Sequence, residues 1–318
     1  MFIGFLTSGQ LGDLRNSLKW AKEHGFKSIS IATRPGGEFF KVDEAISRPR
    51  EIKKIVDETG VIISAIGFYG NPISPDELTR KLHQEHFMKL IEAAYKLELP
   101  VVTGWIGKYS ESEEENYKVI EKEWPKIIKY AEERGVKIAI ENCPGNIMYR
   151  PDIWEKVFEI LQSKIIGLEF DPSHLICQLI DVIEVADKFG KRIYHTHMKD
   201  AEVLWSKVRH YGVRSRGWCP HRLPGFGDLN WAKFISILKK HGVKKIEVFG
   251  SYARGEAKPG SDLDVIVEFE KRKSLLELVG IEQELEDALG IKVDLLTKAS
   301  ISPYLIERIE KESKVVFE

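Results

Sequence analysis

The chain has 318 residues, which suggests about two domains, since a domain averages roughly 150 residues. Its 48 Lys and Arg residues against 49 Asp and Glu residues give a formal net charge of −1, so we expect neither a nucleic-acid partner nor a membrane-surface partner. No apolar run reaches the ~18 residues of a membrane span, and we expect a cytoplasmic protein. The cysteines Cys143, Cys177 and Cys219 have no paired spacing, so we expect neither a disulfide framework nor a thiolate zinc site.

From the N-terminus to about residue 240, short β-branched runs alternate with longer amphipathic stretches. The predicted strands are Phe2–Leu6, Ser28–Ala32, Ile62–Gly67, Val101–Trp105, Lys137–Ile140, Gly167–Phe170 and Ile193–His197. The predicted helices between them include Asp13–His24, Arg48–Glu58, Thr79–Leu97, Glu113–Arg134 and Asp152–Leu161. Seven β-then-α units of this kind predict parallel strands with crossover helices, as in a (β/α)8 barrel. A doubly wound sheet is the alternative, but no glycine-rich nucleotide fingerprint follows the first strand.

The pattern changes after the seventh strand. Asp200–Gly227 is rich in Arg, Gly, Trp and Pro and is predicted to be a long loop, followed by a helix at Trp231–His241. The elements predicted beyond it are the strands Lys244–Phe249, Leu263–Phe269 and Lys292–Leu296 and the helices Ser274–Leu289 and Pro303–Glu312. We therefore predict an α/β chain: an incomplete (β/α)8 barrel of seven units over residues 1–241, then a small α+β domain with a mixed sheet over residues 242–318. The helix at residues 231–241 is shared between the two.

The second domain carries a constellation suited to nucleotide chemistry. Gly250 and Ser251 follow a predicted strand, and their backbone N–H groups and hydroxyl can approach a triphosphate closely. Asp262 and Asp264 are two residues apart on the next strand, so their carboxylates share a face and suit Mg²⁺ together with substrate phosphates. Asp294, on the third strand, is the candidate for a third carboxylate, which could complete a two-metal site or act as base towards the attacking hydroxyl. The alternative is an ordinary surface turn, because Gly, Ser and Asp are common turn residues.

The run Gly250-Ser251-Tyr252-Ala253-Arg254-Gly255 followed by Ser261-Asp262-Leu263-Asp264 resembles the minimal nucleotidyltransferases of the DNA polymerase β superfamily, close to the antitoxin-type members that pair with HEPN proteins. The resemblance covers about residues 232–318. It implies Asp262 and Asp264 as metal ligands, Asp294 as the third catalytic carboxylate, Ser251 at the nucleotide phosphates and ATP as the donor. For Arg254, a phosphate contact and a loop-bracing salt bridge remain open.

A second constellation lies in the first domain, where three predicted strands end on chemically active side chains. Glu141 ends strand five, Asp171 ends strand six and His197 ends strand seven, so all three meet at the carboxyl-terminal mouth of a barrel. Mixed carboxylate and imidazole donors suit Mn²⁺, Co²⁺ or Zn²⁺. Taken singly, each residue is better explained by a strand-end cap or a core histidine, but the three together favour a metal site. We expect His195 to be structural, pointing to the side of the strand opposite His197.

The runs Ala139-Ile140-Glu141-Asn142, Phe170-Asp171-Pro172-Ser173-His174 and His195-Thr196-His197-Met198-Lys199-Asp200 resemble the xylose-isomerase-like sugar isomerases and epimerases. So does Arg222-Leu223-Pro224-Gly225-Phe226-Gly227, and the resemblance covers about residues 1–241. It implies Glu141, Asp171 and His197 as metal ligands, with His174 and Lys199 near a sugar or sugar phosphate.

The two resemblances compete for one strand. The barrel family ends on an eighth strand that supplies a fourth ligand, and in this sequence that ligand position falls on Gly250. A strand has two hydrogen-bonding edges, so Lys244–Phe249 cannot serve both a barrel and a separate sheet. If the second domain keeps it, the barrel has seven strands and an open edge, from which homodimerisation follows as a hypothesis. We then expect weak or absent isomerase activity.

The sequence thus favours Mg²⁺-dependent transfer of a nucleotidyl group, AMP from ATP, to a hydroxyl acceptor, with a HEPN-type protein as a possible acceptor. Two alternatives stay open. The barrel alone could act as a metal-dependent sugar isomerase or epimerase, or the second domain could be a non-catalytic, antitoxin-like binding module.

Overall fold

A computed structural model of the chain describes residues 4–223, 225–238, 243–249, 263–269, 281–283, 286, 292–296 and 314–317. The chain divides into two compact units, Met1–Asp228 and Leu229–Glu318. Within the described residues, no helix has both the length and the apolar character that crossing a membrane requires.

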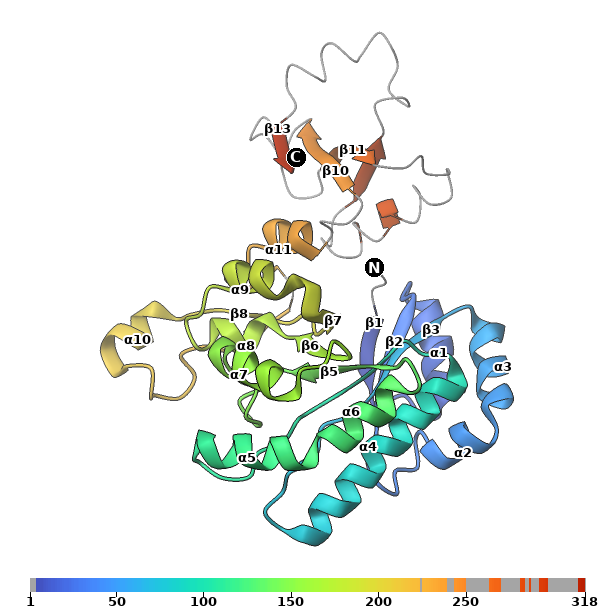
Figure 1. Ribbon diagram of the computed structural model, residues 1–318. Helices are drawn as coiled ribbons and strands as arrows, with labels where there is room; N and C mark the ends of the chain where they lie inside the picture. The colour runs from blue at the N-terminus through green and yellow to red at the C-terminus, as the bar shows by residue number, and fades with distance from the viewer. Residues whose placement is uncertain are drawn as a thin grey trace. The chain divides into compact units, whose positions relative to one another are not determined.

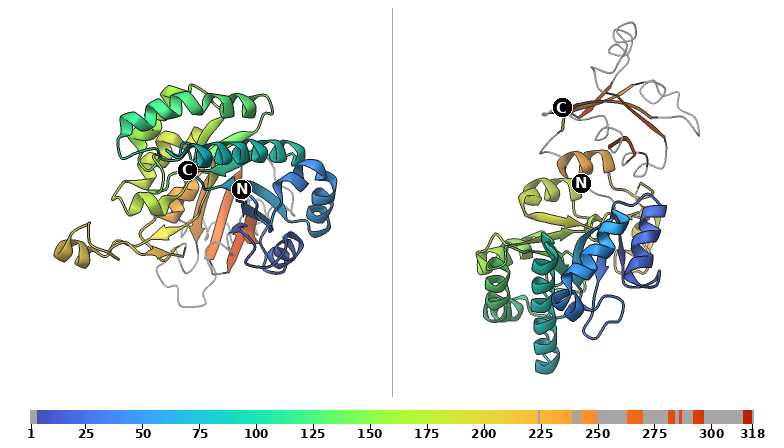
Figure 2. Two further views of the ribbon diagram at one scale, coloured as in Figure 1. Left: turned by 90° about the horizontal axis from the view of Figure 1, so that it is seen from below. Right: turned by 90° about the vertical axis from the view of Figure 1, so that its right-hand side faces the viewer.

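Seven parallel strands form the sheet of the first unit, in the same order in space as in sequence. They are β1 Gly4–Thr7, β2 Ser28–Ala32, β3 Ile62–Phe68, β4 Val101–Gly104, β5 Lys137–Glu141, β6 Ile166–Phe170 and β7 Ile193–Thr196. The sheet is curved, and helices cover its outer face (Figure 1; Figure 2). This is an incomplete (β/α)8 barrel, and the seven predicted strands are confirmed to within one residue at each end where the chain is described. Phe2 and Ile3 of the first predicted strand lie outside the described residues.

The main helices of the first unit follow the strands along the chain. They are α1 Leu14–Glu23, α2 Val42–Ser47, α3 Pro49–Thr59, α4 Glu77–Leu97, α5 Glu113–Glu123, α6 Pro125–Glu132, α7 Pro151–Leu161, α8 Pro172–Ile176 and α9 Val182–Phe189. The long helix α4 begins after Asp76, whose side chain accepts a hydrogen bond from the backbone N–H of Thr79. Its buried side chains Phe87, Leu90 and Ile91 recur at helical spacing and fix the face that packs inward.

Two predictions about this unit are wrong in detail. The stretch Glu113–Arg134, predicted as one helix, is two helices, because Pro125 begins α6 and cannot donate the backbone hydrogen bond that would continue α5. The segment Asp200–Gly227, predicted as a long loop, contains the helix α10 Trp205–Tyr211. It also contains the antiparallel strand pair β8 Asp200–Ala201 and β9 His221–Arg222.

The expectation about cysteines is also wrong. Cys177, just after α8, forms a disulfide with Cys219, just before β9, with 5.5 Å between their Cα atoms. Their separation of 42 residues carries no recognisable spacing, because the fold of the 200–223 segment brings them together. Cys143 is the free cysteine. The disulfide ties that segment to the helix that follows β6.

The second unit contains the helix α11 Trp231–Leu238 and a four-stranded sheet in the order β12-β11-β10-β13. Strand β10 Val243–Phe249 is antiparallel to both neighbours, β11 Leu263–Phe269 and β13 Lys314–Phe317. Strand β12 Val293–Leu296 is parallel to β11. The predicted mixed sheet is confirmed, and β13 is a strand beyond the three that the sequence predicted.

Strand β10 decides how the chain is partitioned. Both of its hydrogen-bonding edges are filled, by β11 and by β13, so it cannot also close the barrel. In the structure it is therefore the four-stranded sheet of the second unit that contains this strand. Of the helix predicted at Ser274–Leu289, residues 281–283 and 286 are helical, and its other residues and the helix predicted at Pro303–Glu312 lie outside the described residues.

The outer edge of the small sheet is partly protected by side chains. The backbone N–H groups of Val293 and Leu295 in β12 donate to the carboxylates of Glu286 and Glu282, each over 3.0 Å. The two glutamates are four residues apart, about one turn of a helix, and the two amides are two residues apart on the strand. These two spacings cover similar lengths, so both hydrogen bonds can form side by side. Edge amides satisfied in this way are less available to another strand.

Candidate functional site

The register of β5, β6 and β7 sets three chemically active residues in a row across the sheet. Glu141 on β5 is the partner of Glu169 on β6, and Glu169 is the partner of His195 on β7. Just beyond β7, the backbone N–H of His197 donates to the carbonyl of Phe170 over 2.9 Å. Parallel strands present their carboxyl ends at the same rim, so these side chains converge.

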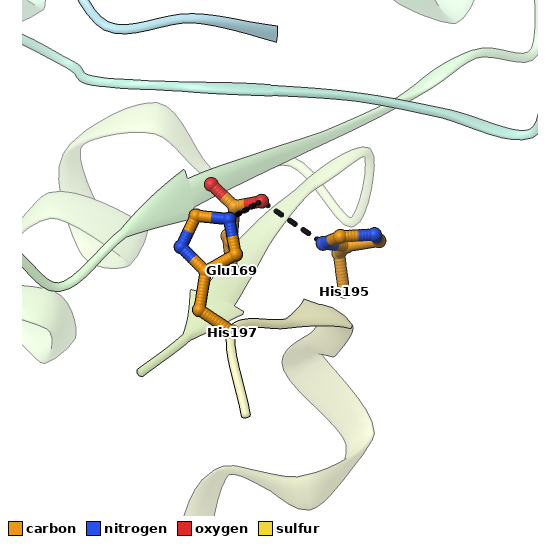
Figure 3. A group of neighbouring side chains, drawn as sticks. All are labelled: Glu169, His195 and His197. Carbon is orange, nitrogen blue, oxygen red and sulfur yellow. Dashed lines mark hydrogen bonds and ion pairs between the residues drawn. The ribbon is translucent and has the colours of Figure 1, made fainter. Parts of the chain in front are cut away.

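Glu169 lies at the centre of this row, and its side chain is fully buried. Its Oε1 lies 2.9 Å from Nδ1 of His195 and 3.1 Å from Nε2 of His197 (Figure 3). Its Oε2 accepts a hydrogen bond of 3.0 Å from the hydroxyl of Tyr69. Burial pushes the pKa of Glu169 up, but the two histidines outweigh burial and bring it down to about 2. The carboxylate is therefore ionised.

His197 is held between two carboxylates, one on each ring nitrogen. Its Nδ1 lies 2.7 Å from Oε1 of Glu141, and its Nε2 faces Glu169. Burial pushes the pKa of His197 down, but Glu169 and Glu141 outweigh burial and raise it to about 10. The other oxygen of Glu141, Oε2, accepts a hydrogen bond of 2.8 Å from the indole of Trp105. In this arrangement the ring is an imidazolium that bridges the two acids.

Asp171 and Lys199 form the other half of the site. Nζ of Lys199 lies 2.6 Å from Oδ2 of Asp171 and 4.0 Å from Oε1 of Glu141. Nε2 of His174 lies 3.4 Å from the same Asp171 oxygen. Burial lowers the pKa of Lys199, but Asp171 and Glu141 outweigh burial, so the net shift is upward. The ammonium group is therefore the cation at this pair of acids.

The backbone around Asp171 explains why its carboxylate is fixed. Its other oxygen, Oδ1, accepts hydrogen bonds from the backbone N–H of Ser173 at 3.0 Å and from the Ser173 hydroxyl at 2.6 Å, and caps α8. The side chain of Asn142 binds the backbone of Asp171 twice. It accepts a hydrogen bond of 2.6 Å from the N–H of Asp171 and donates one of 2.8 Å to the carbonyl of Asp171. The adjacent ends of β5 and β6 are thereby clamped together.

The structure places all five residues predicted for the barrel site at this rim, but it divides the predicted metal ligands. Among the described residues, potential ligand atoms within 4.8 Å of one another form two groups. Glu141 and Asp171 group with His174, whereas His197 groups with Glu169 and His195. Both groups combine carboxylate and imidazole donors, which fits a divalent transition ion or zinc.

Two residues of the site were misjudged from the sequence. The expectation that His195 points away from His197 is wrong, because both rings contact Glu169. In extended chain, residues two apart share a face. Glu169 was missed altogether. The signal was available, since Glu169 lies two residues before Asp171 and the alternation along β6 turns both toward the same side.

The residues predicted for the second domain are described only in part. The parallel register of β11 and β12 pairs Asp264 with Asp294. The side chain of Asp294 is exposed, between the buried Val293 and Leu295. The predicted residues Asp262, Gly250, Ser251 and Arg254 lie outside the described residues.

Two family models match the chain. The model described as "Xylose isomerase-like TIM barrel" matches residues 18–268, and the model described as "Nucleotidyltransferase domain" matches residues 232–316. The matches overlap over residues 232–268, which contain β10 and β11. The overlap falls on the strand for which the two resemblances compete.

Curated relatives match both parts. The Methanocaldococcus jannaschii protein named "Putative protein adenylyltransferase MJ0435" is 56% identical over 81 residues, which cover 26% of this chain and 87% of that protein. Protein adenylyltransferase MntA of Thermococcus cleftensis is 45% identical over 76 residues, covering 24% of this chain and 77% of its own length. The uncharacterized protein YfiH of Bacillus subtilis is 28% identical and covers 76% of this chain and 90% of its own length.

Solved structures resemble the barrel. A xylose isomerase domain protein from Planctomyces limnophilus superimposes with a TM-score of 0.59 at 19% identity, covering 75% of this chain and 86% of that one. A D-tagatose 3-epimerase-like protein gives a TM-score of 0.59 at 22% identity, covering 76% of this chain and 86% of that one. At these identities the likeness concerns the fold.

Proposed function

The chain belongs to the xylose isomerase-like TIM barrel family and also carries a nucleotidyltransferase domain. Because the relatives of that second domain are named as adenylyltransferases, we propose that the protein transfers AMP from ATP to a hydroxyl acceptor. The observation that supports this most is the 56% identity to a relative named as an adenylyltransferase, over most of that relative's length. The barrel has no comparable support for an activity of its own.

The proposed chemistry uses three carboxylates and one turn. Asp262 and Asp264 would hold Mg²⁺, which when bound neutralises charge on the triphosphate. Gly250, Ser251 and Arg254 would contact the phosphates. The acceptor oxygen attacks the α-phosphorus, the bond to the β-phosphate breaks, pyrophosphate leaves, and Asp294 takes the acceptor's proton. The register that pairs Asp264 with Asp294 supports placing these two positions at one site.

The acceptor we propose is a tyrosine or serine hydroxyl of a protein partner of the HEPN type, and we place the protein in the cytoplasm, where ATP is available. The alternative is that the second domain is not catalytic and neutralises its partner by binding alone. This alternative makes a different prediction. In that case replacing the acidic residues would leave co-purification with the partner unchanged, and no AMP would be transferred by the unaltered protein.

The test is transfer of label from ATP labelled at the α-phosphate, with the full chain and candidate acceptor proteins. The double variant Asp262→Asn with Asp264→Asn should lose labelling by at least about 100-fold, since the acids that hold the metal ion are gone. The control is Asp57→Asn, which removes an exposed carboxylate from α3 in the barrel. Labelling that persists in the double variant would refute the assignment.

A second candidate function belongs to the barrel, and the convergence of carboxylates and imidazoles at its rim favours it. Glu141, Asp171 and His197 would hold Mn²⁺, Co²⁺ or Zn²⁺, and His174 and Lys199 would face a sugar or sugar phosphate. The fourth ligand of the barrel family would fall on Gly250, so we expect this isomerase or epimerase activity to be weak or absent. Robust, metal-dependent ketose–aldose or epimer exchange that is lost in Glu141→Ala would overturn that expectation.

A further inference from the structure

Glu169, His195 and His197 bring one carboxylate and two imidazoles together, apart from the group of Glu141, Asp171 and His174. We propose that Glu169, His195 and His197 form a binding site for an imidazole-preferring divalent ion of the Zn²⁺ type. This inference rests on the second candidate function only in assuming that the barrel binds a divalent ion. It differs in the ligands, since two of the three are absent from the set that the sequence predicted.

The three donor atoms are already gathered around one small space. Oε1 of Glu169 lies 2.9 Å from Nδ1 of His195 and 3.1 Å from Nε2 of His197 (Figure 3). Ligands bound at about 2.0–2.2 Å from one ion lie roughly 3–3.5 Å from each other. Two imidazoles with one carboxylate are a donor set that zinc and related ions bind.

The atoms of these residues that would not face the ion have partners. Nδ1 of His197 lies 2.7 Å from Glu141, and Nε2 of His195 lies 3.4 Å from the hydroxyl of Ser64. Oε2 of Glu169 accepts from the hydroxyl of Tyr69, which also lies 3.1 Å from the hydroxyl of Thr103. Such outer partners fix the tautomer and the orientation of metal-binding rings.

The neighbouring acid Asp171 differs from Glu169 in its partner, which is an ammonium group. Asp171 already has a cation, because Nζ of Lys199 lies 2.6 Å from its Oδ2 and 4.0 Å from Glu141. An ion on the set predicted from the sequence would have to displace that ammonium group. Among the described residues, Glu169 contacts no such ammonium group: its fully buried carboxylate faces the two imidazoles and the Tyr69 hydroxyl, so an ion there would bring the charge that a buried acid needs. The arrangement therefore favours Glu169 over Asp171 as the metal-binding acid.

The test is zinc stoichiometry and affinity in the full chain, in an Asp262→Asn and Asp264→Asn background that removes the two acids proposed to hold Mg²⁺ in the second domain. Glu169→Gln and His195→Asn should each weaken zinc binding by at least about 100-fold, whereas Asp171→Asn, the matched loss of a buried acid, should leave about one zinc per chain. Circular dichroism checks that each variant is folded.

A measurement without barrel substitutions guards against variants that unfold. In the same background, zinc should protect His195 and His197 from diethylpyrocarbonate, as read by mass spectrometry, and leave His174 reactive. Protection of His174 with His195 still reactive would overturn the inference. Zinc lost from Asp171→Asn but kept by His195→Asn would also overturn it while leaving the second candidate function standing. Absence of zinc from every variant would defeat both, and the labelling experiment is independent of all these outcomes.

Discussion

His86, on α4, is a buried histidine whose surroundings favour the neutral ring. Its Nε2 lies 2.9 Å from the hydroxyl of Thr33, and its ring packs edge-on against Phe68. Burial, helped by the nearby charge of Lys89, lowers the pKa of His86 to about 4. Because an unfolded histidine has a pKa near 6.5, the unfolded chain binds a proton more readily, and the folded state loses stability as the pH falls from about 6.5 to 4.

We therefore predict that between pH 7 and pH 5 this residue removes about 1–2 kcal/mol from the free energy of unfolding. In His86→Gln, which cannot take up a proton, the free energy of unfolding should depend less on pH over that range, although the variant is less stable at pH 7. Urea unfolding of both proteins at the two pH values provides the comparison. Equal pH dependence in both would show that His86 does not carry this effect.

The site shows which residues a single sequence can reveal. Glu141, Asp171 and His197 stand at or just after predicted strand ends, and the rule that active residues gather there identified them. Glu169 and His195 lie inside strands, where a polar residue is easily taken for a structural one. Their role depends on which strands are neighbours and in what register, and the pairing of Glu141 with Glu169 and of Glu169 with His195 is a property of the folded sheet.

At the scale of elements, the connection between α8 and the β8–β9 pair depends on the disulfide. With 42 residues between Cys177 and Cys219, the cross-link restricts a long stretch of the unfolded chain. Replacing both cysteines by serine should lower the free energy of unfolding by about 2–4 kcal/mol under non-reducing conditions. The difference should vanish when a reductant is present.

Thiol alkylation followed by mass spectrometry measures the disulfide directly. Of the three cysteines in the sequence, only Cys143 should react under denaturing conditions before reduction, and all three should react afterwards. Reaction of Cys177 and Cys219 before reduction, in protein kept from reductants, would contradict the cross-link. The sequence could not foresee this pair, because nothing in the spacing distinguishes it from three isolated cysteines.

The elements themselves were largely predictable, and the failures have local causes. Alternation of β-branched runs with amphipathic stretches located β1 to β7. The break at Pro125 was available in the sequence, because proline cannot continue a helical hydrogen-bond ladder. The short strands β8 and β9 contain only two residues each, Asp200–Ala201 and His221–Arg222, so no periodicity could reveal them. They form only because the chain between them returns on itself.

At the scale of the whole molecule, the seven-stranded sheet has β1 and β7 as its terminal strands. Each has one edge with no partner strand among the described residues, and Leu6 on β1 is 43% exposed. Open edges with apolar residues favour pairing with another chain. We predict a homodimer, which light scattering after size-exclusion chromatography would detect.

Leu6→Lys should weaken that dimer by about 10-fold or more, because it puts a charge on the open edge. The control Leu78→Lys changes an 80% exposed leucine that belongs to helix α4 and not to a strand of the sheet. A well-folded monomer at all concentrations, or equal weakening by both substitutions, would count against association through β1.

Strand β10 serves the second domain and not the barrel, which leaves the transferase with its strand and the barrel without a closing one. A short thiol-specific cross-linker tests it in a chain whose native cysteines are replaced by serine. With cysteines at Val248 and Val265, which the antiparallel register pairs, we predict efficient cross-linking within one chain. With cysteines at Val248 and Phe5 of β1, we predict none. The reverse result would show that β10 closes an eight-stranded barrel and would contradict the account.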